Sequence, residues 1–145
     1  MTNATECEAV VVAEVPARPE RVFRALTSSD VTKWWVRPGV FDTREWSGDV
    51  RVGGNWRASG IARGNQYTLE GQFVEVAAPS KLVHTWKLAG APLVSTVTYE
   101  LQPTPSGTRI TLHHGPFPSE EACAPNRIGW ETSFDALVQL FGDER

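Results

Sequence analysis

The apolar positions near the C-terminus repeat with the period of an α-helix. On a helix with 3.6 residues per turn, positions i, i+4, i+7, i+8 and i+11 lie on one side. Here these positions hold apolar residues: Trp130, Phe134, Leu137, Val138 and Phe141. Polar residues occupy the other side, namely Glu131, Thr132, Asp135 and Gln139. We therefore predict a long amphipathic helix over residues 119–141 whose stripe packs against a large apolar surface.

The ends of this helix also carry signals. Ser119 followed by Glu120 and Glu121 is typical of a capped N-terminus, and Gly142 is a stop signal. Pro125 lies inside the span, so we expect either a kink or a separate short turn before the main helix.

The rest of the chain alternates with the period of β-strands, apart from one short stretch. Residues 8–15 are β-branched and predict a first strand, and residues 19–26 and 31–35 predict two short helices. Turn residues then separate six further predicted strands, at residues 41–52, 55–61, 67–76, 81–88, 93–102 and 108–114. The order is one strand, two short helices, six strands and one long helix, which predicts a single α+β domain over residues 1–145.

Alternation also indicates which side chains face the core. Val97, Tyr99 and Leu101 share one face of their strand, and the inward face of the last strand is Ile110, Leu112 and His114. By the same rule, one face of the predicted strand at 81–88 carries Leu82, His84 and Trp86. A curved antiparallel sheet with one apolar face can bury that face under the C-terminal helix, and such an arrangement tends to leave a cavity at its open side.

Composition narrows the choice of partner. The net charge of −3 and the scattered basic residues argue against nucleic-acid binding. A mean hydropathy of −0.27 and the lack of an apolar run near the ~20 residues of a membrane span argue against a membrane protein. Residues 1–8 have neither the basic nor the apolar region of a signal peptide, so we expect a cytoplasmic protein, monomeric or weakly dimeric.

The chain contains two cysteines, Cys7 and Cys123. They have no neighbouring Cys or His, and zinc needs about four clustered ligands, so we expect no metal site and no cofactor. In a cytoplasmic protein we expect both thiols to be reduced.

Several stretches together resemble a known superfamily. They are the run Val-Pro-Ala-Arg-Pro-Glu-Arg-Val-Phe-Arg-Ala-Leu-Thr at 15–27, the pair Trp34-Trp35, the run Asp-Val-Arg-Val-Gly-Gly-Asn-Trp-Arg at 49–57, and Gly129-Trp130. This pattern resembles the START-like (helix-grip, polyketide cyclase-like, SRPBCC) superfamily, and within it the bacterial branch named for similarity to the activator of the heat-shock-protein ATPase.

The resemblance implies a helix-grip fold, in which a seven-stranded curved antiparallel sheet wraps around the long C-terminal helix and leaves an elongated apolar cavity. Carried over residue by residue, the resemblance places these residues on the cavity wall or at its mouth: Trp35, Trp56, Trp86, Tyr99, Leu112, His114, Trp130 and Phe134. The superfamily contains ligand carriers, cyclases, sequestering resistance proteins and co-chaperones, so the fold does not decide among these functions.

Three functions follow as hypotheses. The first is binding of a small hydrophobic molecule, aromatic or polycyclic, which could serve sequestration or self-resistance; the six tryptophans favour a flat ligand. The second is a cyclase or hydrolase that uses His114 or His84 as acid or base. The third is a co-chaperone-like module that binds a chaperone through its surface.

Other polar residues offer weaker signals for a site. Glu70 and Glu75 have an odd separation on one predicted strand, which places them on opposite faces and argues against a carboxylate pair. Arg51 and Arg57 could bind an anionic group at the cavity rim, but the simpler interpretation, which we favour, is that they pair with Glu or Asp across the sheet.

Overall fold

The computed structural model describes residues 6–37 and 39–143. Within this part of the chain, no helix is long and apolar enough to cross a membrane. The strands are β1 (Cys7–Val15), β2 (Val36–Arg37), β3 (Phe41–Gly48), β4 (Asn55–Ala62), β5 (Asn65–Ala77), β6 (Lys81–Leu88), β7 (Val94–Thr104) and β8 (Gly107–Phe117). The helices are α1 (Pro19–Leu26), α2 (Val31–Trp34) and α3 (Glu120–Asp143).

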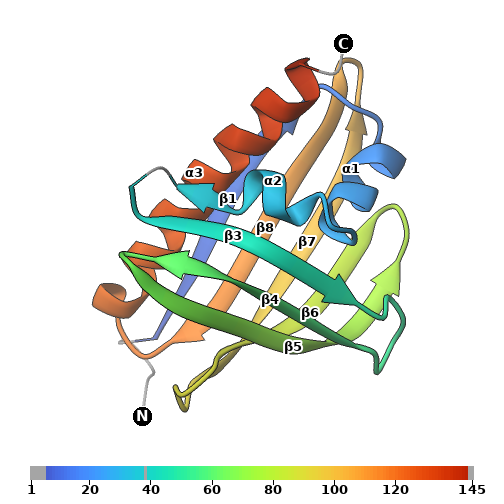
Figure 1. The fold of residues 1–145 in the computed structure, drawn as a ribbon. Coiled ribbons are helices and arrows are strands. Elements are labelled where there is room, and N and C mark those ends of the chain that lie inside the picture. The colour runs from blue at the N-terminus through green and yellow to red at the C-terminus, as the bar shows by residue number, and fades with distance from the viewer. Residues whose placement is uncertain (1–5, 38, 144–145) are drawn as a thin grey trace.

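The strands form one antiparallel sheet in the order β1-β8-β7-β6-β5-β4-β3-β2. The sheet curls, and α3 lies along its concave side, where it contacts both edge strands, β1 and β2 (Figure 1). Helix α3 thereby spans the curled sheet from one edge strand to the other. This architecture confirms the predicted α+β helix-grip fold.

In the described part of the chain the sheet has eight strands rather than the predicted seven. The additional strand, β2, has two residues, Val36 and Arg37, which pair with Asp42 and Phe41 of β3. Two residues are too few to give a period-2 signal in the sequence.

Helix α3 begins as predicted. The Ser119 hydroxyl accepts a hydrogen bond from the backbone N–H of Ala122 at 3.2 Å, which is the expected capping contact. The helix continues through Pro125, so the alternative of a separate short turn is wrong. Next to the proline, the Asn126 side-chain amide donates to the carbonyl of Ala122 at 3.0 Å, on a turn where the proline removes a backbone donor.

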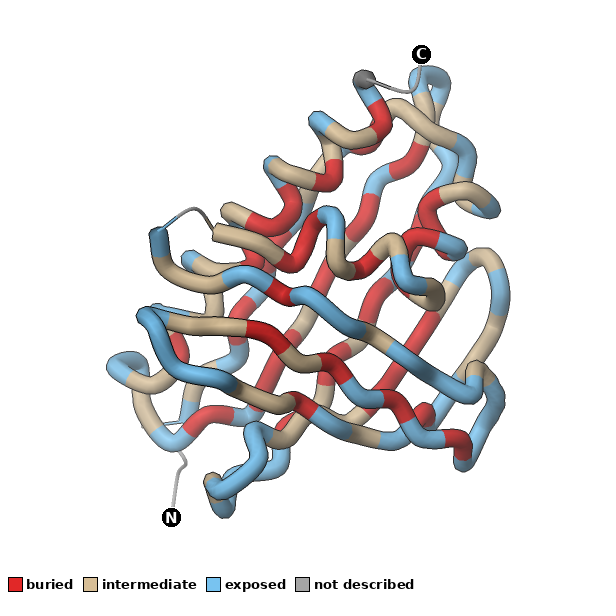
Figure 2. The backbone as a smooth tube through the Cα atoms, viewed as in Figure 1, coloured by how far each residue is buried: buried red, intermediate tan, exposed pale blue. Residues whose placement is uncertain are grey.

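The inward faces match the predicted alternation. The α3 stripe residues Trp130, Phe134, Leu137 and Phe141 are buried, and so are the inward residues of β7 and β8. Figure 2 shows this pattern as buried positions that recur along strands such as β7 and β8 and along one side of α3. The core therefore lies between the concave sheet and the helix.

Cys7 and Cys123 form a disulfide, with their Cα atoms 5.9 Å apart. The prediction of reduced thiols was therefore wrong. The two residues are separated by 116 positions, and only the packing of α3 against β1 brings them together. A pairing over that distance leaves no local signal in the sequence.

Candidate functional site

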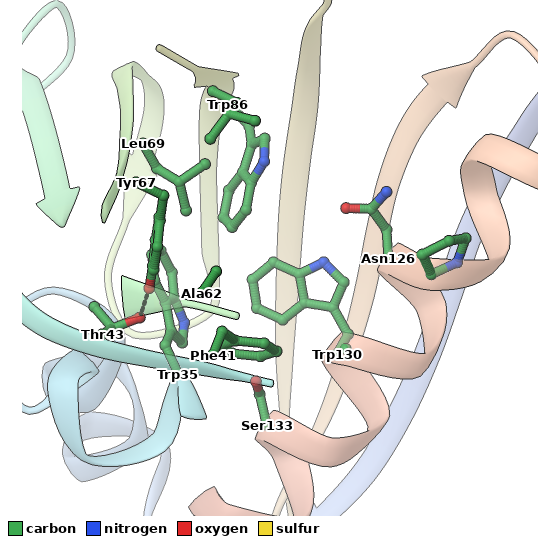
Figure 3. Close-up of a pocket in the computed structure, with 13 residues that line it drawn as sticks. Trp35, Phe41, Thr43, Ala62, Tyr67, Leu69, Trp86, Asn126, Trp130 and Ser133 are labelled. Carbon is green, nitrogen blue, oxygen red and sulfur yellow. Dashed lines mark hydrogen bonds between the residues drawn. The ribbon is translucent and has the colours of Figure 1, made fainter. Parts of the chain in front are cut away.

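A pocket of about 320 Å³ opens between the sheet and the first half of α3 (Figure 3). It is lined by residues from the end of α2, from β3, β4, β5 and β6, and from α3: Trp35, Phe41, Thr43, Ala62, Tyr67, Leu69, Trp86, Leu88, Pro125, Asn126, Gly129, Trp130 and Ser133. Leu88 and Pro125 are exposed, so the pocket meets solvent between the end of β6 and the early turns of α3.

Three indole rings form a continuous aromatic wall of this pocket. The ring centroids of Trp35 and Trp86 are 5.3 Å apart, those of Trp86 and Trp130 are 5.4 Å apart, and those of Trp35 and Trp130 are 5.8 Å apart. All three pairs are tilted or edge-to-face, which is the favourable arrangement for aromatic contacts. A flat ligand would therefore lie against this wall rather than between separated rings.

The Trp130 ring is held in place by a buried polar chain. Its indole N–H donates to Nδ1 of His114 at 3.0 Å, and Nε2 of His114 lies 2.8 Å from the hydroxyl of Ser95. An indole N–H can only donate, so Nδ1 must be the acceptor and the imidazole carries its proton on Nε2. Burial, and secondarily the neighbouring His84, lower the pKa of His114 to about 3, which keeps the ring neutral.

His84 has a similar structural environment on β6. Its Nδ1–H donates to the backbone carbonyl of Thr85 at 3.0 Å, and its ring contacts Trp56 at a centroid distance of 4.9 Å. Burial lowers the pKa of His84 to about 4. Neither His84 nor His114 lines the pocket.

The carbonyl of Thr85 also accepts the indole N–H of Trp56 at 3.0 Å. That contact passes next to Gly71 of β5. A Cβ atom on Gly71 would lie 2.1 Å from the Thr85 oxygen and 2.4 Å from the Trp56 nitrogen, so a side chain there is incompatible with this contact.

The polar groups of the pocket are few and uncharged. The hydroxyls of Thr43 and Tyr67 form a short hydrogen bond with each other (Figure 3). Burial raises the pKa of Tyr67, and the Asp42 carboxylate adds to that increase against the opposing effect of the Thr43 bond. Across the pocket lie the Asn126 carboxamide and the Ser133 hydroxyl.

The structure separates the eight residues expected on the cavity wall into two groups. Trp35, Trp86 and Trp130 line the pocket. The others are buried in the core and are not among the lining residues: Trp56, Tyr99, Leu112, His114 and Phe134. They do face the concave side of the sheet, but neighbouring side chains fill the space around them.

Other lining residues were not expected, above all Phe41, Thr43, Tyr67 and Leu69. Tyr67 and Leu69 alternate along β5 and Phe41 and Thr43 along β3, so the period-2 rule could have identified them as inward residues. The sequence contains no signal for which inward residues border empty space.

The remaining candidates lie away from the pocket. Glu70 and Glu75 are both exposed, because the register of β5 shifts between Phe73 and Glu75; the expectation of opposite faces was wrong. Arg51 pairs with Asp49 at 2.7 Å, and neither Arg51 nor Arg57 lines the pocket.

The curled sheet, the long helix and the pocket between them define a START-like domain with the helix-grip fold. Residues 16–142 match the family described as Activator of Hsp90 ATPase homolog 1-like protein, and the chain belongs to that family.

Solved structures share this fold. Protein CV1439 from Chromobacterium violaceum has a TM-score of 0.83 at 24% identity, over 92% of this chain and 96% of that one. Protein NE0264 from Nitrosomonas europaea has a TM-score of 0.78 at 27% identity, over 95% of this chain and 96% of that one. Protein MLL2253 from Mesorhizobium loti has a TM-score of 0.77 at 26% identity, over 96% and 99% of the two chains. A search of curated proteins finds no match for this sequence.

Proposed function

We propose that this protein binds a small, flat, largely apolar molecule in the pocket between the sheet and α3. The observation that carries the proposal is the wall of Trp35, Trp86 and Trp130, which borders a pocket of about 320 Å³ that is open to solvent. Aromatic walls with a few uncharged polar groups are typical of small-molecule sites.

The pocket volume limits the size of the ligand. A dry cavity of about 150 Å³ holds one benzene molecule. The present pocket, at about 320 Å³, has roughly twice that volume, which suits a molecule of about two fused rings. Large polycyclic compounds would extend past Leu88 and Pro125 into solvent.

Burial supplies the binding free energy. If a two-ring ligand loses roughly 250 Å² of apolar surface to the pocket, the gain is about 6 kcal/mol at ~25 cal/mol per Å², before the cost of association. Contacts between the ligand ring and the three indoles add to this. After the cost of association, the net affinity should be in the high-micromolar to millimolar range, which suits reversible binding.

The pocket supports binding more strongly than catalysis. The acid or base of the cyclase or hydrolase hypothesis was His114 or His84. Both side chains are buried outside the pocket lining, and both are committed to hydrogen bonds within the core. Their lowered pKa values leave them neutral near pH 7, so neither is poised to donate a proton to a ligand.

The family description names an Hsp90 ATPase activator, which raises the co-chaperone alternative for this chain. No feature of the described residues favours it over ligand binding. Capture of a ligand for sequestration or self-resistance remains compatible with the pocket, and the identity of the natural ligand would decide between these roles.

Intrinsic tryptophan fluorescence tests the proposal. Titration with two-ring aromatic compounds should quench the emission saturably, and the Trp86→Phe variant should lose a large share of that change. Trp46→Phe is the matched control, since Trp46 lies on β3 outside the pocket lining. A response that is flat, or that depends on Trp46 instead of Trp86, would contradict the proposal.

A further inference from the structure

The charge of the pocket restricts the charge of its ligand. Among residues 6–37 and 39–143, those that line the pocket include no Asp, Glu, Lys, Arg or His. A ligand carboxylate or ammonium placed against the three indoles would lose its hydration without gaining an ion partner, which is strongly unfavourable. The Asp42 carboxylate acts on Tyr67, but it is itself paired with Arg44 at 3.2 Å.

The hydroxyl pair gives the pocket one strong polar anchor. Thr43 and Tyr67 carry two hydroxyl protons, and the bond between them uses one. Within residues 6–37 and 39–143, neither hydroxyl has a second hydrogen-bond partner. Whichever hydroxyl donates to the other, the pair retains one O–H donor and free acceptor lone pairs.

The two hydroxyls differ in how accessible they are. Thr43 is 2% exposed, whereas Tyr67 is only partly buried. Figure 3 shows the Tyr67 ring standing beside Leu69 on the pocket wall, with its hydroxyl at the Thr43 end and Trp130 on the opposite side. Thr43 therefore positions the Tyr67 hydroxyl, and Tyr67 is the more accessible of the two to a ligand.

We infer, on the basis of the proposed function, that the ligand is an uncharged two-ring aromatic molecule. A hydroxyl or carbonyl oxygen of this ligand forms a hydrogen bond with the Thr43–Tyr67 hydroxyl pair. The aromatic body lies against the indole wall. The oxygen satisfies the hydroxyl proton that the pair leaves unused. Phenols and ketones on a fused-ring skeleton have this chemistry, whereas fatty acids and aromatic acids do not.

Calorimetric titration with three matched probes tests this inference. Naphthalene supplies the ring system alone, 2-naphthol adds a neutral hydroxyl, and 2-naphthoate adds a carboxylate. We expect 2-naphthol to bind about five- to tenfold more tightly than naphthalene, the contribution of one hydrogen bond. We expect 2-naphthoate to bind at least ~100-fold more weakly than 2-naphthol.

Variants assign the effect to the hydroxyl pair. In the double variant Thr43→Val/Tyr67→Phe, the ratio of the naphthalene and 2-naphthol dissociation constants should fall close to one. Thr68→Val is the matched control: it makes the same isosteric change on β5, at a residue that does not line the pocket. If the double variant does not fold, Tyr67→Phe alone is the substitute, because it keeps the aromatic ring and removes only the hydroxyl. It should still reduce the ratio of the naphthalene and 2-naphthol dissociation constants.

The outcomes separate a failure of this inference about ligand chemistry from a failure of the proposed binding function. Equal binding of naphthalene and 2-naphthol by the native protein, an unchanged ratio in the hydroxyl-free variant, or tight binding of 2-naphthoate would overturn the inference and leave the proposed function standing. Failure of all three probes to bind would contradict the proposed function itself.

Discussion

Gly129 is a glycine in the interior of α3 whose position faces the pocket. Glycine in a helix interior lowers stability by about 0.5–1 kcal/mol relative to alanine. A Cβ atom at this position would lie 3.9 Å from Cε1 of Phe41, an ordinary van der Waals distance. No steric reason therefore requires glycine there, and its effect is to leave space in the pocket.

The perturbation is to fill that space. Gly129→Ala should stabilise the fold by about 0.5–1 kcal/mol through helix propensity alone. Gly129→Leu should add the burial of roughly 60–100 Å² of apolar surface, about 1.5–2.5 kcal/mol, less about 0.5–1 kcal/mol of lost side-chain entropy. With the gain in helix propensity included, the net stabilisation of about 1–3 kcal/mol corresponds to a rise in Tm of roughly 2–12 °C for a domain of this size.

The same substitution should abolish binding, because the leucine side chain occupies the volume that the ligand needs. Thermal unfolding followed by circular dichroism measures the first effect, and calorimetric titration with 2-naphthol measures the second. Gly142→Ala is the control: it lies at an exposed position where no atom of the described residues is within 4 Å of the added Cβ, so it should leave binding unchanged. A Gly129→Leu protein that is less stable, or that binds as well as the native protein, would show that Gly129 does not border the ligand site.

Three further predictions concern stability. His84 and His114 have pKa values lowered to about 4 and about 3, so the unfolded chain binds more protons below pH 6.5, and stability should fall as the pH drops from about 6.5 towards 4. At pH 5, urea unfolding should show a loss in the free energy of unfolding of roughly 2 kcal/mol for each of the two histidines, and His114→Gln should remove about half of this pH dependence. A urea midpoint that does not change with pH would contradict the burial of these two side chains. Reduction of the Cys7–Cys123 disulfide, or Cys123→Ser, should lower the free energy of unfolding by about 2–5 kcal/mol because the bond closes a long loop; equal unfolding midpoints with and without reductant would count against the bond. Gly71→Ala should destabilise the fold by more than about 2 kcal/mol, since the added methyl group overlaps the backbone of β6; a native-like melting temperature would show that the strands can separate there without cost.

Much of the fold could be predicted because its signals are local. The stripe from Trp130 to Phe141 defines α3, and alternation in β7 and β8 identifies the buried face. Features that depend on distant parts of the chain could not be predicted. The disulfide joins the first residue of β1 to the fourth residue of α3, and the register shift before Glu75 reverses the face that alternation assigns to it.

The candidate site illustrates the same limit. Trp35, Trp86 and Trp130 are large inward aromatic residues, and a sequence can identify them as such. Whether a given inward residue borders space or packs against a neighbour depends on how the whole core is filled. Tyr99 and Trp86 face the same side of the sheet on adjacent strands, yet Tyr99 is enclosed by other rings and only Trp86 lines the pocket.

The six tryptophan indole N–H groups allow a direct test of where a ligand binds. In a ¹H–¹⁵N correlation spectrum, with each signal assigned by a Trp→Phe variant, addition of 2-naphthol should shift the indole signals of Trp35, Trp86 and Trp130. The signal of Trp46, on β3 outside the pocket lining, should stay in place. We expect saturable shifts that are confined to the three wall residues. A spectrum that does not change, or one in which Trp46 responds and the three wall residues do not, would contradict it.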